Sequence, residues 1–130
     1  TNTGQILSGG LAYSGGVGQD RIVNTGEIIG DIILGDDDDR YMGRSGVVDG
    51  DIFGGAGEDT LVGGEEANGL FGGDDDDQIY SLGGVDQVEG GAGNDDIYTG
   101  SGDDFGSGDD GDDLIRLGSG DDFFTGGAGD

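Results

Sequence analysis

The sequence predicts an all-β fold, a right-handed parallel β-roll in which each coil of a solenoid contributes two strands. Three observations lead to this prediction: a nine-residue repeat without gaps over the C-terminal part, glycine at 35 of 130 positions, and 30 acidic residues against four basic ones. Repeats of this length are typical of parallel β-helices, and glycine permits the tight turns that such coils need. We therefore expect one elongated domain of stacked coils.

The repeat runs continuously from Gly54. It reads GGAGEDTLV, GGEEANGLF, GGDDDDQIY, SLGGVDQVE, GGAGNDDIY, TGSGDDFGS, GDDGDDLIR and LGSGDDFFT, and a shortened GGAGD follows. Position eight is apolar in every repeat except the one with Gly106. Position six is acidic except in one repeat, and it carries Asp59, Asn68, Asp77, Asp86, Asp95, Asp104, Asp113 and Asp122. Composition alone does not produce such a register.

The first 53 residues follow a longer rhythm. The nonapeptides GGVGQDRIV (15–23) and LGDDDDRYM (34–42) alternate with NTGEIIGDII (24–33) and GRSGVVDGDIF (43–53). Successive nonapeptides here start 19 or 20 residues apart, so each coil is about two nonapeptides long throughout. We expect N-terminal coils over residues 1–53 and a continuous nonapeptide roll over 54–130, within one solenoid.

Each nonapeptide predicts a six-residue turn followed by a three-residue strand. Glycine at positions one, two and four supplies the positive φ angles of the turn. Side chains alternate along a strand, so position eight points into the roll. The expected core is Ile22, Tyr41, Leu61, Ile79, Ile97 and Ile115 on one sheet, against Leu70, Val88 and Phe124 on the other.

The charge of the chain requires a cationic partner. A formal charge of −26 opposes any compact state, and a hydrophobic content of 31% is too low to offset it. We therefore expect the metal-free chain to be disordered. Nucleic acid and membrane surfaces are excluded as partners because both require clustered basic residues.

Stacked turns would place the position-six aspartates in a ladder, one strand spacing apart, where like charges repel unless a cation lies between them. Calcium suits this arrangement because it accepts six to eight oxygen ligands from carboxylates and backbone carbonyls. Magnesium demands a tighter octahedral geometry, and zinc lacks ligands because the chain has no histidine or cysteine.

The GGxGxDxUx repeats resemble the repeats-in-toxin (RTX) family of calcium-binding β-rolls. The resemblance implies that each ion lies between turns one coil apart. It also implies that the position-six side chains of both turns are ligands. Carried over to this sequence, one edge of the roll carries Asp20, Asp39, Asp59, Asp77, Asp95 and Asp113, and then the shortened GGAGD. The other edge carries Asn68, Asp86, Asp104 and Asp122.

The same resemblance implies that carbonyls of the turns complete each shell. The candidates are Gly54, Gly55, Ala56, Gly57, Gly72, Gly73, Asp74, Asp75, Gly90, Gly91, Ala92, Gly93, Gly100, Gly102, Gly118 and Gly120. The gaps between stacked turns give about nine sites, six on the first edge and three on the second. We expect the gap between Asn68 and Asp86 to hold calcium most weakly, because Asn68 has no carboxylate and Glu66 replaces a glycine.

No catalytic function is predicted, because the chain has no histidine, cysteine or lysine to serve as nucleophile or tuned base. The tyrosines and phenylalanines Tyr13, Tyr80, Tyr98, Phe105 and Phe123 could form a sugar-stacking surface, but we expect them to fill the core or cover an edge. Arg21 and Arg40 occupy position seven in successive coils, where we expect surface ion pairs.

Two hypotheses for function remain. The first is a structural module of a larger secreted or cell-surface bacterial protein, which folds on calcium binding outside the cell. The alternative is a calcium-dependent adhesin or polysaccharide-binding module. No apolar run is long enough to span a membrane, and the sequence from Thr1 onward has no signal-peptide pattern. We expect a secretion signal, and a neighbouring coil or cap after the shortened last turn, in adjacent domains of the parent chain.

Overall fold

The computed structural model describes residue 1 and residues 4–129, without the side chains of residues 7–9. Asn2 and Thr3, which begin a sequence NTGQI similar to the start of NTGEIIGDII (24–33), lie outside the described residues. Fourteen strands make up the regular structure of this part of the chain. They are β1 (Gln5–Val17), β2 (Arg21–Val23), β3 (Glu27–Asp36), β4 (Arg40–Met42), β5 (Val47–Asp49), β6 (Asp51–Ala56), β7 (Thr60–Val62), β8 (Gly69–Asp74), β9 (Gln78–Tyr80), β10 (Gln87–Ala92), β11 (Asp96–Tyr98), β12 (Phe105–Asp110), β13 (Leu114–Arg116) and β14 (Phe123–Ala128).

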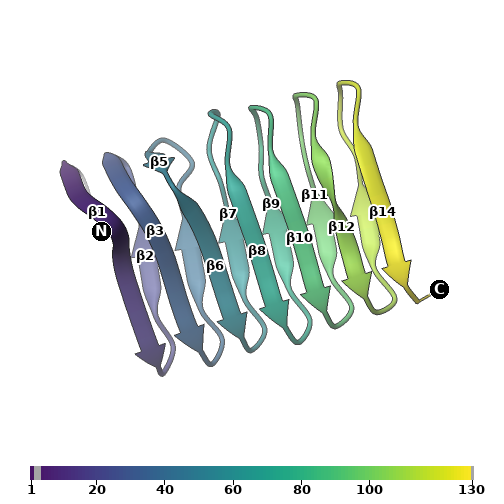
Figure 1. Cartoon of the computed structure of the whole chain (residues 1–130), viewed down its shortest axis with the longest axis horizontal. Helices are drawn as coiled ribbons and strands as arrows, with labels where there is room; N and C mark the ends of the chain where they lie inside the picture. The colour runs from purple at the N-terminus through teal and green to yellow at the C-terminus, as the bar shows by residue number, and fades with distance from the viewer. Residues whose placement is uncertain (2–3, 130) are drawn as a thin grey trace.

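The strands form two parallel sheets that face each other across a thin core (Figure 1). The larger, eight-stranded sheet has the order β1-β3-β6-β8-β10-β12-β14, with β5 also paired to β3. The six-stranded sheet has the order β13-β11-β9-β7-β4-β2. The chain passes from one sheet to the other at every turn, so the prediction of an all-β parallel solenoid with two strands per coil is confirmed. No helix that could cross a membrane occurs among the described residues.

The predicted division into six-residue turns and three-residue strands holds for only one sheet. Strands β2, β4, β7, β9, β11 and β13 have three residues, but β6, β8, β10, β12 and β14 have six. Each longer strand continues into the first three residues of the next turn, where Gly55, Gly73 and Gly91 remain paired with one another. The prediction was wrong there because glycine marks a turn in sequence, yet its backbone can equally well extend a ladder.

The predicted core is confirmed at its centre. Leu61, Leu70, Ile79, Val88 and Ile97 have no exposed surface. Ile22, Ile115 and Phe124 are only partly buried because they lie in the outer coils, where a neighbouring rung is missing on one side. The structure adds a group of buried apolar side chains that the nonapeptide pattern did not include: Ile28, Ile32, Leu34, Val48 and Ile52.

At the second edge of the N-terminal coils, a buried amide side chain forms the hydrogen bonds. Asn24 has no exposed surface, and its Nδ2 donates to the carbonyl oxygen of Val47 at 3.1 Å. Its Oδ1 accepts a hydrogen bond from the backbone N–H of Gly26 at 3.1 Å. The side chain also hydrogen-bonds Tyr41, whose burial raises the pKa of the phenol to about 12. Neutral hydrogen bonds thus join these coils at the edge where no aspartate ladder occurs.

Candidate metal centre

Left-handed backbone conformations recur at positions two and four of the turns. Gly55 and Gly57 have φ angles of 129° and 118° in one turn. Gly73 and Asp75 occupy the same positions in the next coil, with φ angles of 131° and 77°. Aspartate tolerates the left-handed region better than most residues, so it can replace glycine at position four. The turns therefore repeat one backbone shape from coil to coil.

One carboxylate oxygen of each position-six aspartate joins successive coils. On the first edge, Oδ1 accepts a hydrogen bond from the backbone N–H of the position-six residue one coil earlier. The Asp59 N–H donates to Asp77 Oδ1, and the Asp77 N–H donates to Asp95 Oδ1, both at 2.8 Å. The ladder runs from Asp20 through Asp39, Asp59, Asp77 and Asp95 to Asp113. A second ladder joins Asn68, Asp86, Asp104 and Asp122. The predicted stacking of turns on two edges is thus confirmed.

The second oxygen of these carboxylates is buried without a hydrogen-bond partner. This holds for Oδ2 of Asp39, Asp59, Asp77, Asp86, Asp95, Asp104 and Asp113. A buried carboxylate oxygen without a partner is costly, and native structures rarely leave one uncompensated. Seven such atoms, repeating at one position of the turn, indicate a ligand that the protein atoms do not supply.

The unpartnered oxygens converge with backbone carbonyls next to the position-one glycines. A Cβ added at Gly54 would collide with Oδ2 of Asp59 and with the carbonyl oxygen of Gly72, one coil further on. Gly72 and Gly90 have equivalent neighbours in the following coils. Glycine at position one therefore leaves room in which a carboxylate oxygen and a carbonyl oxygen from two coils lie close together.

Burial raises the pKa of five of these carboxyl groups. The pKa of Asp77 rises to about 8, mainly through burial and also through the neighbouring Asp59 and Asp95 carboxylates. Burial likewise raises the pKa of Asp59, Asp86 and Asp95 to about 6 and that of Asp39 above its usual value. Hydrogen bonds from the preceding coil oppose these shifts but do not cancel them. The turns therefore favour an added positive charge, either a proton or a cation.

The donor set fits a hard cation. All the converging atoms are oxygens, from carboxylates and backbone carbonyls, which calcium prefers. Among the described residues no three carboxylates gather at one point, so carbonyls of the turns must supply much of any coordination shell. Calcium tolerates such irregular, carbonyl-rich shells better than magnesium does.

The turn with Asn68 departs from the pattern in the way that the sequence predicts. No residue from Gly63 to Asn68 has a positive φ angle. The Oδ1 atom of Asn68 accepts a hydrogen bond from the N–H of Gly64 at 2.8 Å, within its own turn. Both the left-handed backbone and the carboxylate are therefore missing, which supports the expectation of a weak site between Asn68 and Asp86.

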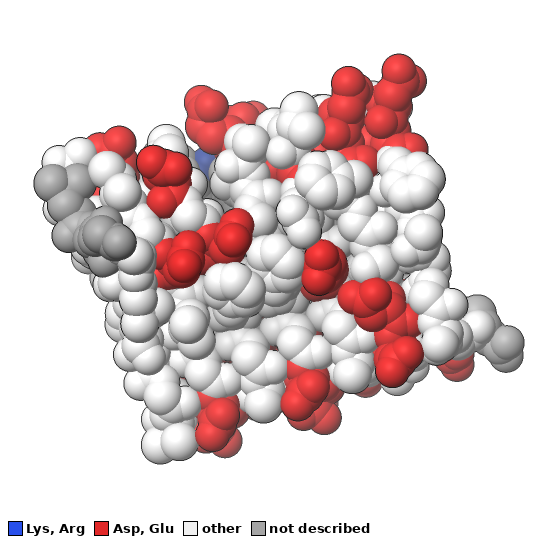
Figure 2. Space-filling model, viewed as in Figure 1, with Lys and Arg blue, Asp and Glu red and all other residues white. Residues whose placement is uncertain are grey.

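Exposed acidic residues form a further ladder that the sequence analysis overlooked. At position five, the N–H of Glu58 donates to Asp38 Oδ1 at 3.3 Å, and the N–H of Asn94 donates to Asp76 Oδ1 at 2.6 Å. Acidic side chains accordingly gather along both rims of the roll (Figure 2). The signal was present in the sequence, because position five is polar in most turns, but the runs of aspartate concealed it. Exposed carboxylates of this kind keep their hydration and do not need a metal.

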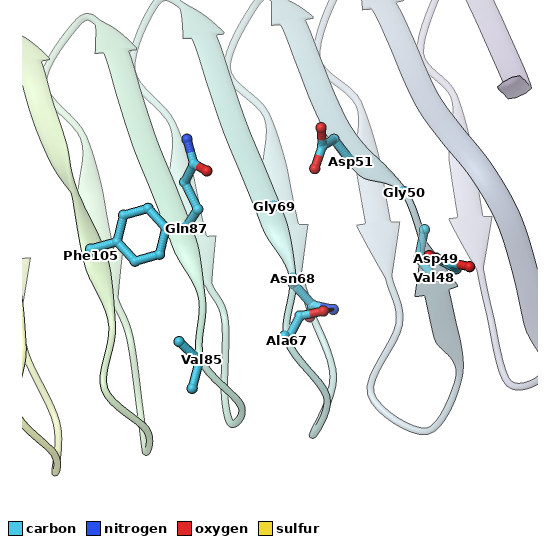
Figure 3. Close-up of a pocket in the computed structure, with 10 residues that line it drawn as sticks. All are labelled: Val48, Asp49, Gly50, Asp51, Ala67, Asn68, Gly69, Val85, Gln87 and Phe105. Atoms are coloured by element: carbon cyan, nitrogen blue, oxygen red, sulfur yellow. Dashed lines mark hydrogen bonds between the residues drawn. The ribbon is translucent and has the colours of Figure 1, made fainter.

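One hollow on the surface lacks the side chains of a nucleophilic catalytic site. It has a volume of about 420 Å³ and lies on the outer face of the eight-stranded sheet, where Ala67 and Gly69 have little or no side chain (Figure 3). Asp49 and Asp51 lie at one side of it, and Gln87 and Phe105 lie at the other. These side chains include no nucleophile with an adjacent base.

Comparison with known proteins agrees with the geometry. The family model described as RTX calcium-binding nonapeptide repeat (4 copies) matches residues 53–88, 71–106 and 98–130, which together make up more than half of the chain. No curated protein and no solved structure matches the chain significantly.

Proposed function

Because the chain belongs to the family of RTX calcium-binding nonapeptide repeats, we propose that it is a structural module that folds when calcium fills its turns. In this proposal the metal-free chain is disordered, and binding of calcium and folding are one linked equilibrium. Calcium supplies the positive charge that the stacked carboxylates require. The residues of the chain supply the oxygen ligands and the two ladders that set their spacing.

The observation that carries the proposal is the set of seven buried Oδ2 atoms without partners. Their burial would destabilise the metal-free roll, because ionised carboxylates are expensive to remove from water. A cation shared between two turns would remove this cost and would also join neighbouring coils. In this proposal the seven Oδ2 atoms explain both why the folded roll is stable with calcium and why it is unstable without it.

The proposed ligands are the position-six side chains and the turn carbonyls named above. On the first edge, the gaps from Asp20 to the shortened last turn give six sites. On the second edge, the gaps from Asn68 to Asp122 give three. Nine divalent ions would bring the formal charge from −26 to about −8, a moderate value for a soluble domain.

We place the module in a larger bacterial protein that is secreted or displayed on the cell surface. RTX repeat proteins are generally secreted, and a chain that stays unfolded until it meets calcium suits export from a calcium-poor interior. Within the module, residues 1–53 and 54–130 have different repeat patterns but share one solenoid, since β6 (Asp51–Ala56) crosses the boundary.

Far-UV circular dichroism with increasing calcium, and separately with magnesium, tests the proposal. We expect a disordered spectrum in chelator and a cooperative gain of β structure with calcium. Magnesium should give little change at the same concentration, because it keeps its waters and prefers a strict octahedral shell. Equal β content in chelator and in calcium would contradict the proposal.

A further inference from the structure

The arginines of this acidic chain all lie on one face. Position seven of the six-stranded sheet carries Arg21 and Arg40, which are direct neighbours on β2 and β4. Arg116 lies at position nine of β13, and Arg44 follows β4 and borders the same face. In the rows of outward side chains on this sheet the only acidic residue is Asp96, and Arg116 forms an ion pair with it. The face is therefore cationic in a chain whose formal charge is −26.

The opposite face has the reverse charge. The outward side chains of the eight-stranded sheet include the acidic residues Glu27, Asp31, Asp49, Asp51 and Glu89 and no arginine. Viewed from that side, the surface shows scattered red patches and almost no blue (Figure 2). The two faces of the roll thus differ in charge, and most of the other acidic residues lie in the turns that border both faces.

Arg40 and Arg44 border a hollow of about 270 Å³ on the cationic face. Val62, which is only 4% exposed, lies in it, and Thr60, Gln78 and Tyr80 bring a hydroxyl, an amide and an aromatic ring. Among the described residues, neither Arg40 nor Arg44 forms an ion pair, so the prediction of a surface ion pair at Arg40 was wrong. Two guanidinium groups thus remain available for an external anion.

Two tyrosines extend the surface along the axis of the roll. Tyr80 and Tyr98 are paired neighbours at position nine of β9 and β11, and Tyr98 is 40% exposed. The expectation that aromatic rings fill the core holds for Tyr13, which packs against it, but it was wrong for Tyr80 and Tyr98, whose side chains at position nine point outward. Neighbouring rungs are about 4.8 Å apart, which is close to the length of one sugar unit in an extended chain. An extended sugar chain lying along the axis could therefore place one ring on each tyrosine.

We propose that the outer face of the six-stranded sheet binds an acidic polysaccharide, with a sugar carboxylate at Arg40 and Arg44 and sugar rings on Tyr80 and Tyr98. Arginine pairs with carboxylate through two parallel hydrogen bonds, and aromatic rings pack on the apolar faces of sugars. Thr60 and Gln78 supply neutral partners for sugar hydroxyls. Nucleic acid fits less well, since it requires many phosphate contacts and the rims of the roll are acidic.

Isothermal titration calorimetry on the folded chain in saturating calcium tests the proposal. The ligands are cellohexaose and the oligo-glucuronate of the same length, which differ only in the carboxylates at C6 and are too short to gel. We expect the oligo-glucuronate to bind at least about tenfold more tightly than cellohexaose, as expected for a charged hydrogen bond. Absence of binding at millimolar ligand would overturn the proposal. So would equal binding by a hexaglutamate peptide, which would indicate attraction by charge alone.

Matched variants locate the site. Arg44→Gln should weaken binding by about tenfold. Arg116→Gln removes the same charge from an arginine that is already paired, and it should have a clearly smaller effect. Tyr80→Ser should weaken binding several-fold, whereas Phe123→Ser removes an exposed ring from the opposite face and should change nothing. Equal losses within either pair would overturn the assignment.

Two checks separate a failure of this proposal from a failure of folding. Circular dichroism in calcium is recorded first, so that only folded variants are compared and the calcium-folding proposal is judged independently. Tyrosine fluorescence of the unmodified chain gives a second measurement, since the chain has no tryptophan. The oligo-glucuronate should change that fluorescence with the same midpoint as the calorimetry. Unchanged fluorescence at saturation would overturn the stacking of sugars on Tyr80 and Tyr98.

Discussion

The N-terminal coils and the nonapeptide coils share the same rungs but are stabilised by different interactions. Among the described residues, six of the twelve buried apolar side chains lie between Ile28 and Ile52, and the other six are spread from Leu61 to Ile97. Buried aspartates are instead concentrated in the nonapeptide coils. Only Asp39 precedes the nonapeptide array, and five lie within it: Asp59, Asp77, Asp86, Asp95 and Asp104.

The second edge shows the same contrast. In the N-terminal coils, the buried amide of Asn24 bonds Val47 and Gly26 without any charge. In the nonapeptide coils, the corresponding edge carries aspartates, and the Oδ2 atoms of Asp86 and Asp104 have no protein partner. An amide supplies both donor and acceptor, so it can satisfy itself within the protein. A carboxylate only accepts, and it makes the coil dependent on an external cation.

Calcium removal should therefore affect the two regions unequally, and this is the largest effect we expect. Each buried aliphatic side chain contributes about 1.5–3 kcal/mol, so the apolar N-terminal coils should resist lower calcium concentrations than the nonapeptide coils. Hydrogen exchange measured by mass spectrometry at decreasing calcium concentration checks this. Amides in residues 60–104 should lose protection at a higher calcium concentration than amides in residues 28–52. A single midpoint for both regions would show that the roll unfolds as one unit.

A single ladder residue should produce the next largest effect. Asp95 lies in the middle of the first edge, between Asp77 and Asp113, so it borders two proposed calcium sites. Asp95→Asn keeps an oxygen that can accept the Asp77 N–H but removes the charge. We expect the calcium midpoint of folding, measured by circular dichroism, to rise by about tenfold, because ligand charge strongly sets calcium affinity.

Asp96→Asn is the matched control for this variant. It removes the same charge at the adjacent position, where the carboxylate only pairs with the exposed Arg116. Exposed ion pairs contribute about 0–1 kcal/mol, so the midpoint should hardly move. Equal midpoints for the two variants would mean that calcium acts by screening the acidic chain and not by binding at defined ligands.

Acidification should partly replace calcium, with a smaller effect. Burial raises the pKa of Asp77 to about 8 and that of Asp59, Asp86 and Asp95 to about 6, from an ordinary value of 3.8. A raised pKa in the folded state means that protonation favours folding. The stability it contributes is complete below about pH 4 and is lost as the pH rises through 6 to 8.

In calcium-free buffer, β content measured by circular dichroism should therefore increase as the pH falls from 8 to 5. In saturating calcium it should stay constant over the same range, because the carboxylates are then ionised in both the unfolded and the calcium-bound states. A calcium-free transition centred near pH 4 would instead point to the exposed carboxylates, whose ordinary pKa lies there.

The sequence predicted the solenoid and its ladders because both depend on a strict period. Position six and position eight recur every nine residues, and a two-strand coil then determines which turns stack, as with Asp77 and Asp95. The period did not predict the length of the longer strands, since glycine suits both turns and extended strands. In the N-terminal coils it identified the buried Tyr41 but not Ile28, Ile32 and Val48, which lie in half-coils of another pattern.

Two features could be found only from the structure: the different partners of the two oxygens of each carboxylate, and the gathering of the arginines on one face. The sequence indicates that Asp59 is a ligand candidate, but only the structure separates Oδ1, which accepts a hydrogen bond from the Asp39 N–H, from the buried Oδ2, which has no partner. Similarly, four arginines scattered over the sequence look too few to form a surface. They gather because positions seven and nine of one sheet point the same way, and Arg44 lies two residues after Met42, the last residue of β4.

The smallest effect should come from repairing the weakest proposed site. Asn68→Asp alone restores a carboxylate, but the turn from Gly63 to Asn68 lacks left-handed residues, and glutamate at position four opposes them. Combining it with Glu66→Gly should let that turn adopt the shape of its neighbours. The combined variant exchanges one acidic residue for another, so the net charge stays at −26 and screening is unchanged.

We expect calorimetry to detect about one additional calcium ion in the combined variant and the folding midpoint to fall by no more than about twofold, because one site among nine is improved. Glu66→Gly alone is the control, since it frees the turn without adding a ligand. If the combined variant binds no more calcium than this control, the gap between residues 68 and 86 is no calcium site. The calcium sites of the second edge would then begin at Asp86, one coil later than the nonapeptide repeat on that edge.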